Sequence, residues 1–306
     1  MSNIIKHIHI EKLFGTTNID WELNPSVNVL VGKNGSGKST ILRAIYTTLV
    51  SDQTLWNDDI DVINKCEITM DNVFTTYSYR LHFLDTSQLN NHKELKNFSQ
   101  NIKPIPMWGF SGLNYEIIST EFISTINMSA NSINNLTTSS GQHTNLLDIE
   151  INNEVLRLLA FDNKETLKES LLSALNSLFS ETNKIIEFAN NKLVVKLTDG
   201  TQIDFSQLSS GERQVIFIFL KVVIASVDGA LILMDEPEIS LHLSWQEKLL
   251  NEIRRVNTTS QIIIVTHSPA MLMNGWIDSF VDIENIMTDV STSNVSISEK
   301  DEEKEE

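Results

Sequence analysis

Short apolar runs alternate with longer amphipathic segments in the C-terminal half of the chain. The runs at 230–234 and 262–265 predict buried strands, and the segments 215–225 and 241–256 have the spacing of helices. Strands that alternate with helices in this way are typical of a sheet that helices cover on both faces. We therefore expect an α/β core in this half of the chain.

The N-terminal part shows the two-residue period of half-buried strands. Ile8 and Ile10 alternate with polar neighbours and predict one strand, and the segments 67–70 and 73–84 predict an antiparallel pair. The segment 117–126 is expected to add a further strand to the core sheet. Together these patterns predict a mixed core sheet with an antiparallel β subdomain.

Two patterns in the middle of the chain predict irregular or tightly turned backbone. Serine, threonine and asparagine dominate residues 129–145, which predicts a mobile loop. The apolar runs 193–197 and 202–205 flank Asp199 and Gly200, and such a pair is typical of a hairpin turn. We expect a β-hairpin there.

Leucine and phenylalanine recur at helical spacing across 164–181, which predicts an amphipathic helix. Its apolar face could pack on its own domain or on a partner, and the pattern leaves both open. No heptad repeat is long enough for a coiled coil. We expect a single head over 1–290, made of an N-terminal lobe, 1–85, a variable helical insertion, 86–190, and a C-terminal lobe, 191–290.

The composition is that of a folded soluble protein. The chain has 306 residues, of which 41% are hydrophobic and 21% charged. Its single cysteine, Cys66, excludes an internal disulfide and a cysteine-based zinc site, which fits a reducing compartment. The N-terminus lacks the layout of a secretory signal, and no apolar run is long enough to span a bilayer. We expect a cytoplasmic protein that does not enter membranes.

The net charge of −17 bears on the choice of partners. Affinity for DNA comes mainly from lysine and arginine side chains that neutralise phosphates, so the charge disfavours DNA binding, although a local basic groove could override it. Part of the charge lies in the segment 291–306, which is expected to be a disordered acidic tail. Docking of this tail to a basic partner is the alternative.

Residues 32–40, GKNGSGKST, fit the phosphate-binding loop pattern of glycine, four spacers, glycine, lysine and serine. An apolar run at 27–31 precedes the loop and an apolar-periodic segment follows it, as a strand–loop–helix unit requires. Backbone N–H groups of such a loop wrap a phosphate chain, and the helix N-terminus favours the negative charge. Lys38 is expected to reach the β- and γ-phosphates of ATP, and the Ser39 hydroxyl to bind Mg²⁺. The expected nucleotide-binding residues of the loop are Asn34, Gly35, Ser36, Gly37, Lys38, Ser39 and Thr40.

A second half-site follows the apolar run at 231–234. Asp235 and Glu236 come directly after this predicted strand, and the carboxyl ends of strands in an α/β sheet lie at the edge where ligands bind. Asp235 is expected to hold Mg²⁺ directly or through water, and Glu236 to accept a proton from the attacking water.

Residues 208–214, LSSGERQ, come before this strand, and His267 follows the next one. The order of these motifs along the chain resembles that of an ABC-type ATPase head. The motifs are the phosphate loop, LSSGE, LILMDE, the SLH at 240–242 and His267. The segment MDEPEISLH, 234–242, is similar to soluble heads of the Rad50, SMC, RecF and overcoming-lysogenization-defect group. The matching motifs cover about 1–50 and 193–270, and the middle of the chain is unmatched.

The resemblance implies that two heads pack head to tail. Each ATP then lies between the phosphate loop of one head and the LSSGE segment, called the signature, of the other. Ser209 and the Gly211 N–H would then meet the partner's γ-phosphate, and His267 would hydrogen-bond the γ-phosphate and sense its loss. The family also has a Q-loop glutamine, for which this sequence favours no residue. The candidates are Gln88, Gln100 and Gln142.

Several functions fit these motifs. The resemblance implies an ATPase whose ATP-driven homodimer, or higher oligomer, gates a separately encoded effector such as a nuclease or toxin, as in bacterial anti-phage systems. The alternative is a DNA-repair ATPase of the RecF or Rad50 kind that binds DNA when ATP closes the dimer. A transporter motor and a protein that keeps ATP as a structural cofactor are two further readings.

Overall fold

The computed structural model describes residues 4–50, 63–71, 75–81, 107–112, 119–125, 135–137 and 143–290. The chain forms two compact units that interleave along the sequence. Unit 1 consists of Met1–Leu23, Arg43–Ile117 and Glu284–Glu306, and unit 2 of Asn24–Leu42 and Ile118–Ile283. Helix α1 (Lys38–Val50) starts in unit 2, and its later turns belong to unit 1.

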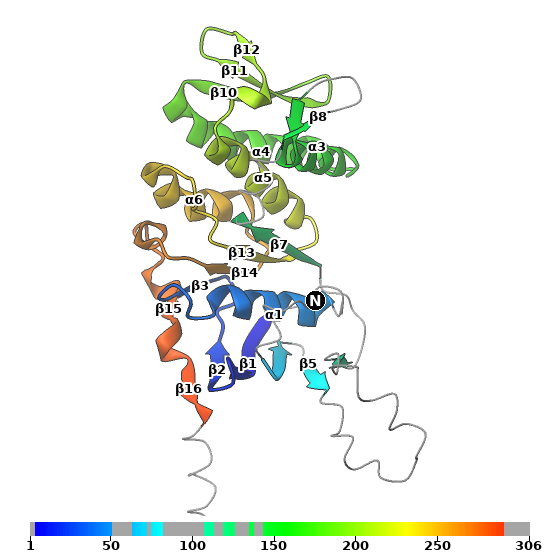
Figure 1. Ribbon diagram of the computed structural model, residues 1–306. Coiled ribbons are helices and arrows are strands. Elements are labelled where there is room, and N and C mark those ends of the chain that lie inside the picture. Colours follow the sequence, from blue (N-terminus) through cyan, green and yellow to red (C-terminus); the bar gives the residue numbers. More distant parts are fainter. Residues whose placement is uncertain are drawn as a thin grey trace, which may run out of the picture. The chain divides into compact units, whose positions relative to one another are not determined.

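Unit 1 contains a six-stranded antiparallel sheet, which confirms the predicted β subdomain (Figure 1). Its strands, in spatial order, are β16 (Met287–Asp289), β2 (Thr17–Glu22), β1 (Ile5–Leu13), β4 (Lys65–Met70), β5 (Thr75–Leu81) and β6 (Met107–Gly112). Alternate residues of β4 and of the middle of β1 are buried, and the register pairs Ile8 with Ile68 and Ile10 with Cys66. This two-residue period places one face of the sheet on a core.

Unit 2 contains a five-stranded, all-parallel sheet. Its strands, in spatial order, are β15 (Phe280–Asp282), β3 (Val27–Val31), β14 (Ile262–Val265), β13 (Leu231–Asp235) and β7 (Thr120–Ser124). The central strands β13 and β14 are buried at every residue, as expected for a parallel sheet with no exposed face. Because the strands are parallel, the loops that leave their carboxyl ends meet at one edge.

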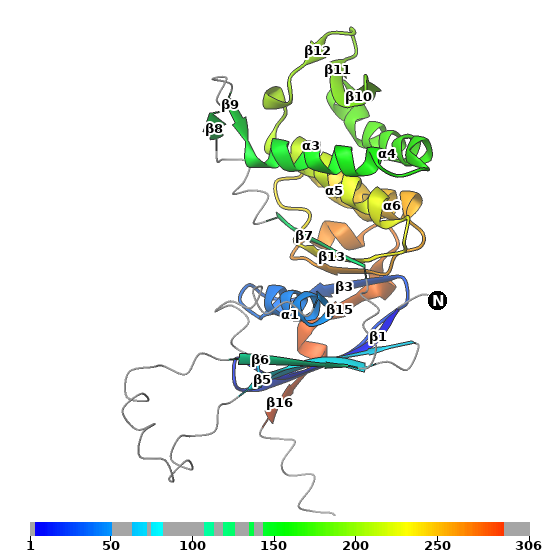
Figure 2. The same ribbon diagram turned by 90° about the vertical axis from the view of Figure 1, so that its right-hand side faces the viewer.

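Helices α5 (Ser210–Ala225) and α6 (Leu243–Val256) pack on one side of this sheet, with α3 (Leu146–Leu159) and α4 (Lys164–Phe179) beyond them (Figure 1). Figure 2 shows α3 lying along α5. Helix α5 is buried on nearly all sides, which explains why its sequence from Val215 onward is apolar except for Lys221. The apolar face of α4, including Leu171 and Leu175, packs into this core. The helix predicted at 164–181 therefore packs on its own domain, which was one of the two possibilities that the sequence left open.

A three-stranded antiparallel sheet follows α4, made of β10 (Lys184–Ala189), β11 (Lys192–Leu197) and β12 (Gln202–Ile203). The hairpin around Asp199 and Gly200 was predicted, whereas β10 was not. Short 3₁₀ helices complete the described chain. They are η3 (Ser180–Thr182), η4 (Phe205–Gln207), η5 (Pro269–Leu272), η6 (Ile277–Ser279) and η7 (Ile283–Asn285).

Part of the predicted loop at 129–145 is wrong. Strands β8 (Asn135–Thr137) and β9 (His143–Asn145) pair there, and Asn145 then caps α3 by accepting a hydrogen bond from the Asp148 N–H at 2.8 Å. The predicted acidic tail at 291–306 lies outside the described residues. No helix in the described part of the chain is long and apolar enough to cross a membrane.

Candidate functional site

The phosphate loop connects β3 to α1, in the strand–loop–helix setting that its pattern requires. Two of its glycines are needed for steric reasons. A Cβ on Gly32 would lie 2.4 Å from Cγ2 of Ile283, and Gly37 has a φ of +96°, which side chains rarely allow. The loop therefore holds a backbone conformation that can turn N–H groups toward an anion.

The Lys38 side chain lies across this loop. Its Nζ donates to the carbonyl oxygens of Gly32 and Lys33, both at 2.9 Å, and the residue is only 3% exposed. Burial lowers the pKa of Lys38, while the carboxylates of Glu236 and Asp235 act in the opposite direction. The ammonium group is thus already inside the loop, at the place where a phosphate chain would need a positive charge.

The Ser36 hydroxyl supports the same reading. Its Oγ is buried and makes no hydrogen bond within the described part of the chain. A buried hydroxyl without a partner is costly, and a phosphate oxygen would satisfy it. The residues of the loop therefore fit a nucleotide phosphate.

The Ser39 hydroxyl donates to Oδ1 of Asp235 at 2.8 Å, although 196 residues separate them in the sequence. Asp235 is fully buried at the end of β13. A hydroxyl and a carboxylate side by side are oxygen donors of the kind that Mg²⁺ takes from proteins, with phosphate oxygens and waters completing its octahedron. The pair therefore fits a Mg²⁺ whose remaining ligands come from a nucleotide and from water.

Glu236 and His267 lie beside each other at the same edge of the sheet. Nε2 of His267 is 2.9 Å from Oε1 of Glu236, and both side chains are partly exposed. The register of β13 and β14 explains the contact, because Asp235 lies opposite Val265 and the two strands end together. The structure thus brings together two residues that the sequence predicted separately.

Glu236 has a left-handed backbone, with a φ of +49°. Such a conformation costs a non-glycine residue on the order of 1–3 kcal/mol, so neighbouring contacts must hold it. The Glu236 N–H donates to the Val265 carbonyl at 2.8 Å, and the buried Thr125 hydroxyl donates to the carbonyl oxygens of both Asp235 and Glu236. Thr125 therefore fixes the turn that aims the Glu236 carboxylate.

Glu238 fixes the opposite side of this arrangement. Its Oε1 accepts hydrogen bonds from the Thr266 hydroxyl, from the His267 N–H at 3.2 Å and from the Ser268 N–H at 3.3 Å. Burial raises the pKa of Glu238, and the hydrogen bond from Thr266 opposes this rise. Glu238 thus holds the backbone that carries the His267 ring.

The signature segment, 208–214, begins helix α5. Ser209 is its N-cap and accepts from the Glu212 N–H at 3.2 Å, while the Glu212 carboxylate accepts from the Ser209 N–H at 2.8 Å, which forms a capping box. Gly211 is buried against the segment after Pro237, where a Cβ would lie 2.4 Å from the Ser240 carbonyl oxygen.

Some predicted site residues are brought together and others are not. Five of them lie together, either in direct contact or at the ends of adjacent strands, and these are Lys38, Ser39, Asp235, Glu236 and His267. In the part of the chain that the structure describes, no hydrogen bond or ion pair joins Ser209 or Gly211 to the phosphate loop. The three candidate Q-loop glutamines lie outside the described residues.

Sequence reasoning missed two residues that shape the site. Glu238 stands within the MDEPE segment, close to the end of a strand, and could have been singled out by that position. A glutamate buried at such a place usually has a partner. Thr125 is 110 residues from Asp235 in the sequence, and no local pattern marks it.

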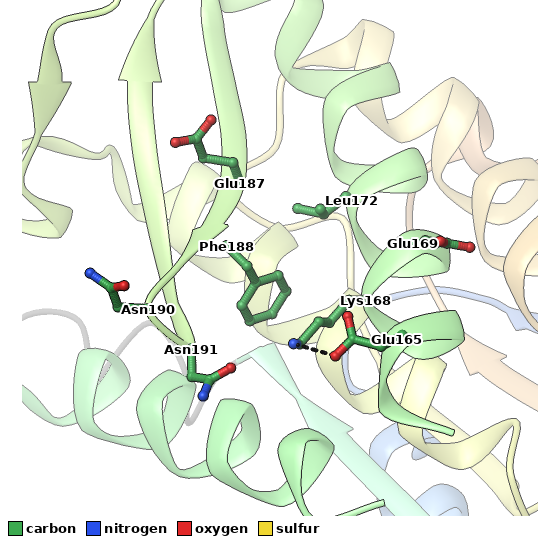
Figure 3. Close-up of a pocket in the computed structure, with 8 residues that line it drawn as sticks. All are labelled: Glu165, Lys168, Glu169, Leu172, Glu187, Phe188, Asn190 and Asn191. Atoms are coloured by element: carbon green, nitrogen blue, oxygen red, sulfur yellow. Dashed lines mark hydrogen bonds and ion pairs between the residues drawn. The ribbon is translucent and has the colours of Figure 1, made fainter. Parts of the chain in front are cut away.

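A groove of about 460 Å³ lies elsewhere in unit 2, between α4 and the hairpin of β10 and β11 (Figure 3). Lys168 crosses it, with Nζ 5.3 Å from the centre of the Phe188 ring and 2.9 Å from Oε1 of Glu165. None of the predicted nucleotide-site residues lines this groove.

Comparisons with known proteins identify the family. The family model described as "AAA domain, putative AbiEii toxin, Type IV TA system" matches residues 106–273, which is more than half of the chain. The chain belongs to this family. Its relatives and fold place it among the ABC-type ATPase heads of the Rad50, SMC and RecF group.

Two curated relatives align with most of this ATPase head. It is 25% identical to the Septu protein PtuA of Bacillus thuringiensis, over 91% of the chain and 75% of that protein. It is 24% identical to the DNA replication and repair protein RecF of Clostridium acetobutylicum, over 71% of the chain but only 61% of that protein.

The fold resembles that of a solved SMC head bound to the C-terminal winged-helix domain of ScpA. The TM-score is 0.55, with 15% sequence identity, and the match covers 89% of this chain and 91% of the other. At this identity the likeness concerns the fold alone. It confirms the α/β P-loop fold of an ABC-type ATPase head.

Proposed function

We propose that this chain binds Mg·ATP and hydrolyses it. The observation that carries the proposal is the meeting of the phosphate loop, the Ser39–Asp235 pair and the Glu236–His267 pair at the carboxyl edge of one parallel sheet. This edge is the place where open α/β sheets bind ligands. The family supports ATP as the substrate.

Each residue has a separate task in this proposal. The loop residues Asn34 to Thr40 bind the phosphates through backbone N–H groups, and Lys38 places its positive charge beside them. Ser39 and Asp235 hold Mg²⁺, which neutralises charge on the phosphates when bound. Glu236 accepts the proton of the attacking water, and its carboxylate lies beside His267 at the sheet edge. His267 donates a hydrogen bond to the γ-phosphate.

We further propose that ATP joins two copies of the chain head to tail. Ser209 is exposed and lies with Gly211 at the N-terminus of α5, where free N–H groups and the helix dipole favour an anion. In this proposal the anion that this end binds is the γ-phosphate of a second copy. Higher oligomers could be assembled from the same dimer.

The ATP-driven change between monomer and dimer is proposed to gate an effector protein, a nuclease or a toxin, in anti-phage defence. The likeness to a Septu protein over most of the chain supports this role. A cytoplasmic location stays a prediction from the sequence.

Replacing Glu236 with glutamine tests the enzymatic part of the proposal. A general base typically contributes about 10²–10⁴-fold to the rate. The Glu236→Gln variant should therefore lose at least about 100-fold in ATP turnover while it still binds ATP. Lys38→Ala should lose ATP binding itself, because it removes the charge inside the loop.

Glu169→Gln is the matched control, since Glu169 is an exposed glutamate of the same unit, on α4. It should turn over ATP at the wild-type rate. Wild-type turnover by Glu236→Gln would reject Glu236 as the base, and full ATP affinity in Lys38→Ala would reject the phosphate-loop assignment.

The alternative is a DNA-repair ATPase that binds DNA in the ATP-bound dimer, which the likeness to RecF favours. The net charge of −17 weighs against it. A duplex-binding assay with the ATP-bound Glu236→Gln variant separates the two functions. Affinity that falls steeply as salt rises would favour DNA binding, and no affinity at low salt would reject it.

A further inference from the structure

The signature helix is tied to the insertion by an ion pair. Nζ of Lys184, the first residue of β10, lies 2.6 Å from Oε1 of Glu212 on α5. The side chains are 18% and 7% exposed, so the pair is largely shielded from water. The other carboxylate oxygen of Glu212 accepts the Ser209 N–H. Glu212 therefore connects Lys184 to the residue proposed to meet the partner's nucleotide.

The position of Lys184 is itself well fixed. Asn183, just before it, has a left-handed φ of +56°, and its carbonyl accepts from the Thr198 N–H at 3.2 Å. Two residues further on, the Asn176 side chain of α4 exchanges two hydrogen bonds with the Ile186 backbone, at 2.7 and 2.9 Å. Lys184 thus starts a strand that both its hairpin and α4 hold in place, and it can serve as a firm anchor for Glu212.

We propose that Lys184 is a positioning residue for the ATP-bound dimer, because it holds the Glu212 carboxylate that orients Ser209 at the start of the signature helix. This inference rests on the proposed head-to-tail dimer. Without Lys184, Glu212 would be a shielded carboxylate that has lost its ion-pair partner, and it would turn toward water. This turn releases the Ser209 N–H and loosens the first turn of α5.

The contact also links the insertion to the signature segment that is proposed to bind the partner's nucleotide. A shift of β10 would move Lys184 and, through this ion pair, Glu212 and Ser209. The nucleotide loop of the same subunit is not on this route. The two consequences, on dimerisation and on ATP binding, can therefore be measured separately.

The test uses the full chain with Glu236→Gln, which is expected to stay ATP-bound, and adds Lys184→Met. Methionine keeps most of the stem of lysine and removes its charge. Sedimentation equilibrium with saturating Mg·ATP should show a dimer dissociation constant raised about ten-fold, the low end expected for losing a hydrogen bond to a charged group. The affinity of the isolated subunit for a fluorescent ATP analogue should stay within about two-fold, because the phosphate loop is untouched.

Lys184→Arg should restore dimerisation, since it keeps the charge and the donor. Lys196→Met is the matched control. Lys196 lies on the same hairpin, in β11, and pairs with Glu187, but both side chains are more than a third exposed. This change should leave the dimer constant unaltered, as expected for an exposed ion pair.

A double-mutant cycle with Glu212→Gln shows whether the effect passes through Glu212. Glutamine still serves in a capping box, so this variant keeps the helix start. Once Glu212 is replaced, Lys184→Met should have no further effect on the dimer constant. An undiminished effect in that background would overturn the proposal. If the methionine variant does not fold, the cycle is run with Lys184→Gln, which also removes the positive charge.

The outcomes separate this inference from the proposed function. If Glu236→Gln dimerises with ATP and Lys184→Met dimerises equally well, Lys184 has no positioning role and the dimer stands. If Lys184→Met weakens ATP binding by the same factor as dimerisation, its role is general stability and the proposal is wrong. If Glu236→Gln itself stays monomeric at saturating Mg·ATP, the head-to-tail dimer fails and the role of Lys184 fails with it.

Discussion

Replacing Gly211 with alanine sets two physical effects against each other. Gly211 is the second residue of α5, and alanine is favoured over glycine in a helix by about 1 kcal/mol. Its φ is not in the left-handed region, so the backbone accepts a side chain. Judged from the helix alone, Gly211→Ala should stabilise the protein.

The neighbouring backbone reverses this expectation. The added Cβ would lie 2.4 Å from the Ser240 carbonyl oxygen and 3.3 Å from the Ser240 carbonyl carbon. Relief requires a separation of about 1 Å between two backbone segments, and overpacking of this kind typically costs about 1–3 kcal/mol. After the gain in helix propensity, a net loss of up to about 2 kcal/mol remains, with a central value of about 1 kcal/mol. For a unit of this size the central value corresponds to a fall in Tm of roughly 2–4 °C.

Thermal unfolding followed by circular dichroism measures this directly. Ser210→Ala is the control, because Ser210 precedes Gly211 in the same helical turn and is exposed. The control should unfold within about 1 °C of the wild type, as most exposed substitutions do. If Gly211→Ala is as stable as the wild type or more so, the close approach of Ser240 to the signature helix is wrong.

Two further predictions concern buried titratable groups. Burial raises the pKa of Cys66, the single thiol of the chain, to about 12. At pH 8 a maleimide should therefore label it at least about 100-fold more slowly in the native protein than in urea. Equal labelling rates would contradict its burial. Burial also raises the pKa of Glu238 above its ordinary 4.5, so its contribution to stability is complete below pH 4.5 and is lost as the pH rises through the folded-state value. Glu238→Gln keeps an acceptor oxygen. Its free energy of unfolding in urea should therefore rise relative to that of the wild type between pH 4.5 and pH 8. A difference in unfolding free energy that stays constant with pH would show that Glu238 does not titrate in this way.

Elements marked by local patterns were predicted well from the sequence. The apolar runs of β3, β13 and β14 identified buried strands of the core sheet, because strands buried on both faces are mostly apolar. The sequence predicted a mixed core sheet, whereas the strands of this sheet are all parallel. The glycines before α1 identified the phosphate loop, because their backbone conformations exclude other residues. In both cases the physical requirement acts within one short segment.

Elements that depend on distant partners were missed. Strand β16 pairs with β2 from the opposite end of the described chain, and nothing in its three residues indicates that pairing. Strands β8 and β9 lie in a polar stretch whose composition is typical of loops. Helix α3 carries apolar residues at helical spacing and could have been found, but no element was predicted between the loop at 129–145 and the helix at 164–181.

The same distinction applies to the candidate site. Lys38, Asp235 and Glu236 follow from motifs, whereas Thr125 and Lys184 act through contacts with residues far away in the sequence. A single sequence does not show such contacts, because each needs the fold before it exists.

The central claim is that ATP places the phosphate loop of one copy against the signature of another. It can be tested with two Glu236→Gln proteins, one carrying Lys33→Cys in the loop and the other Ser210→Cys at the start of α5. Both positions are exposed, and the natural Cys66 is buried. When the two proteins are mixed with a short bis-maleimide, the account predicts a cross-linked species of twice the subunit mass that forms with Mg·ATP, and not with ADP or with either protein alone. Equal cross-linking with and without ATP, or none in protein that has bound ATP, would contradict it.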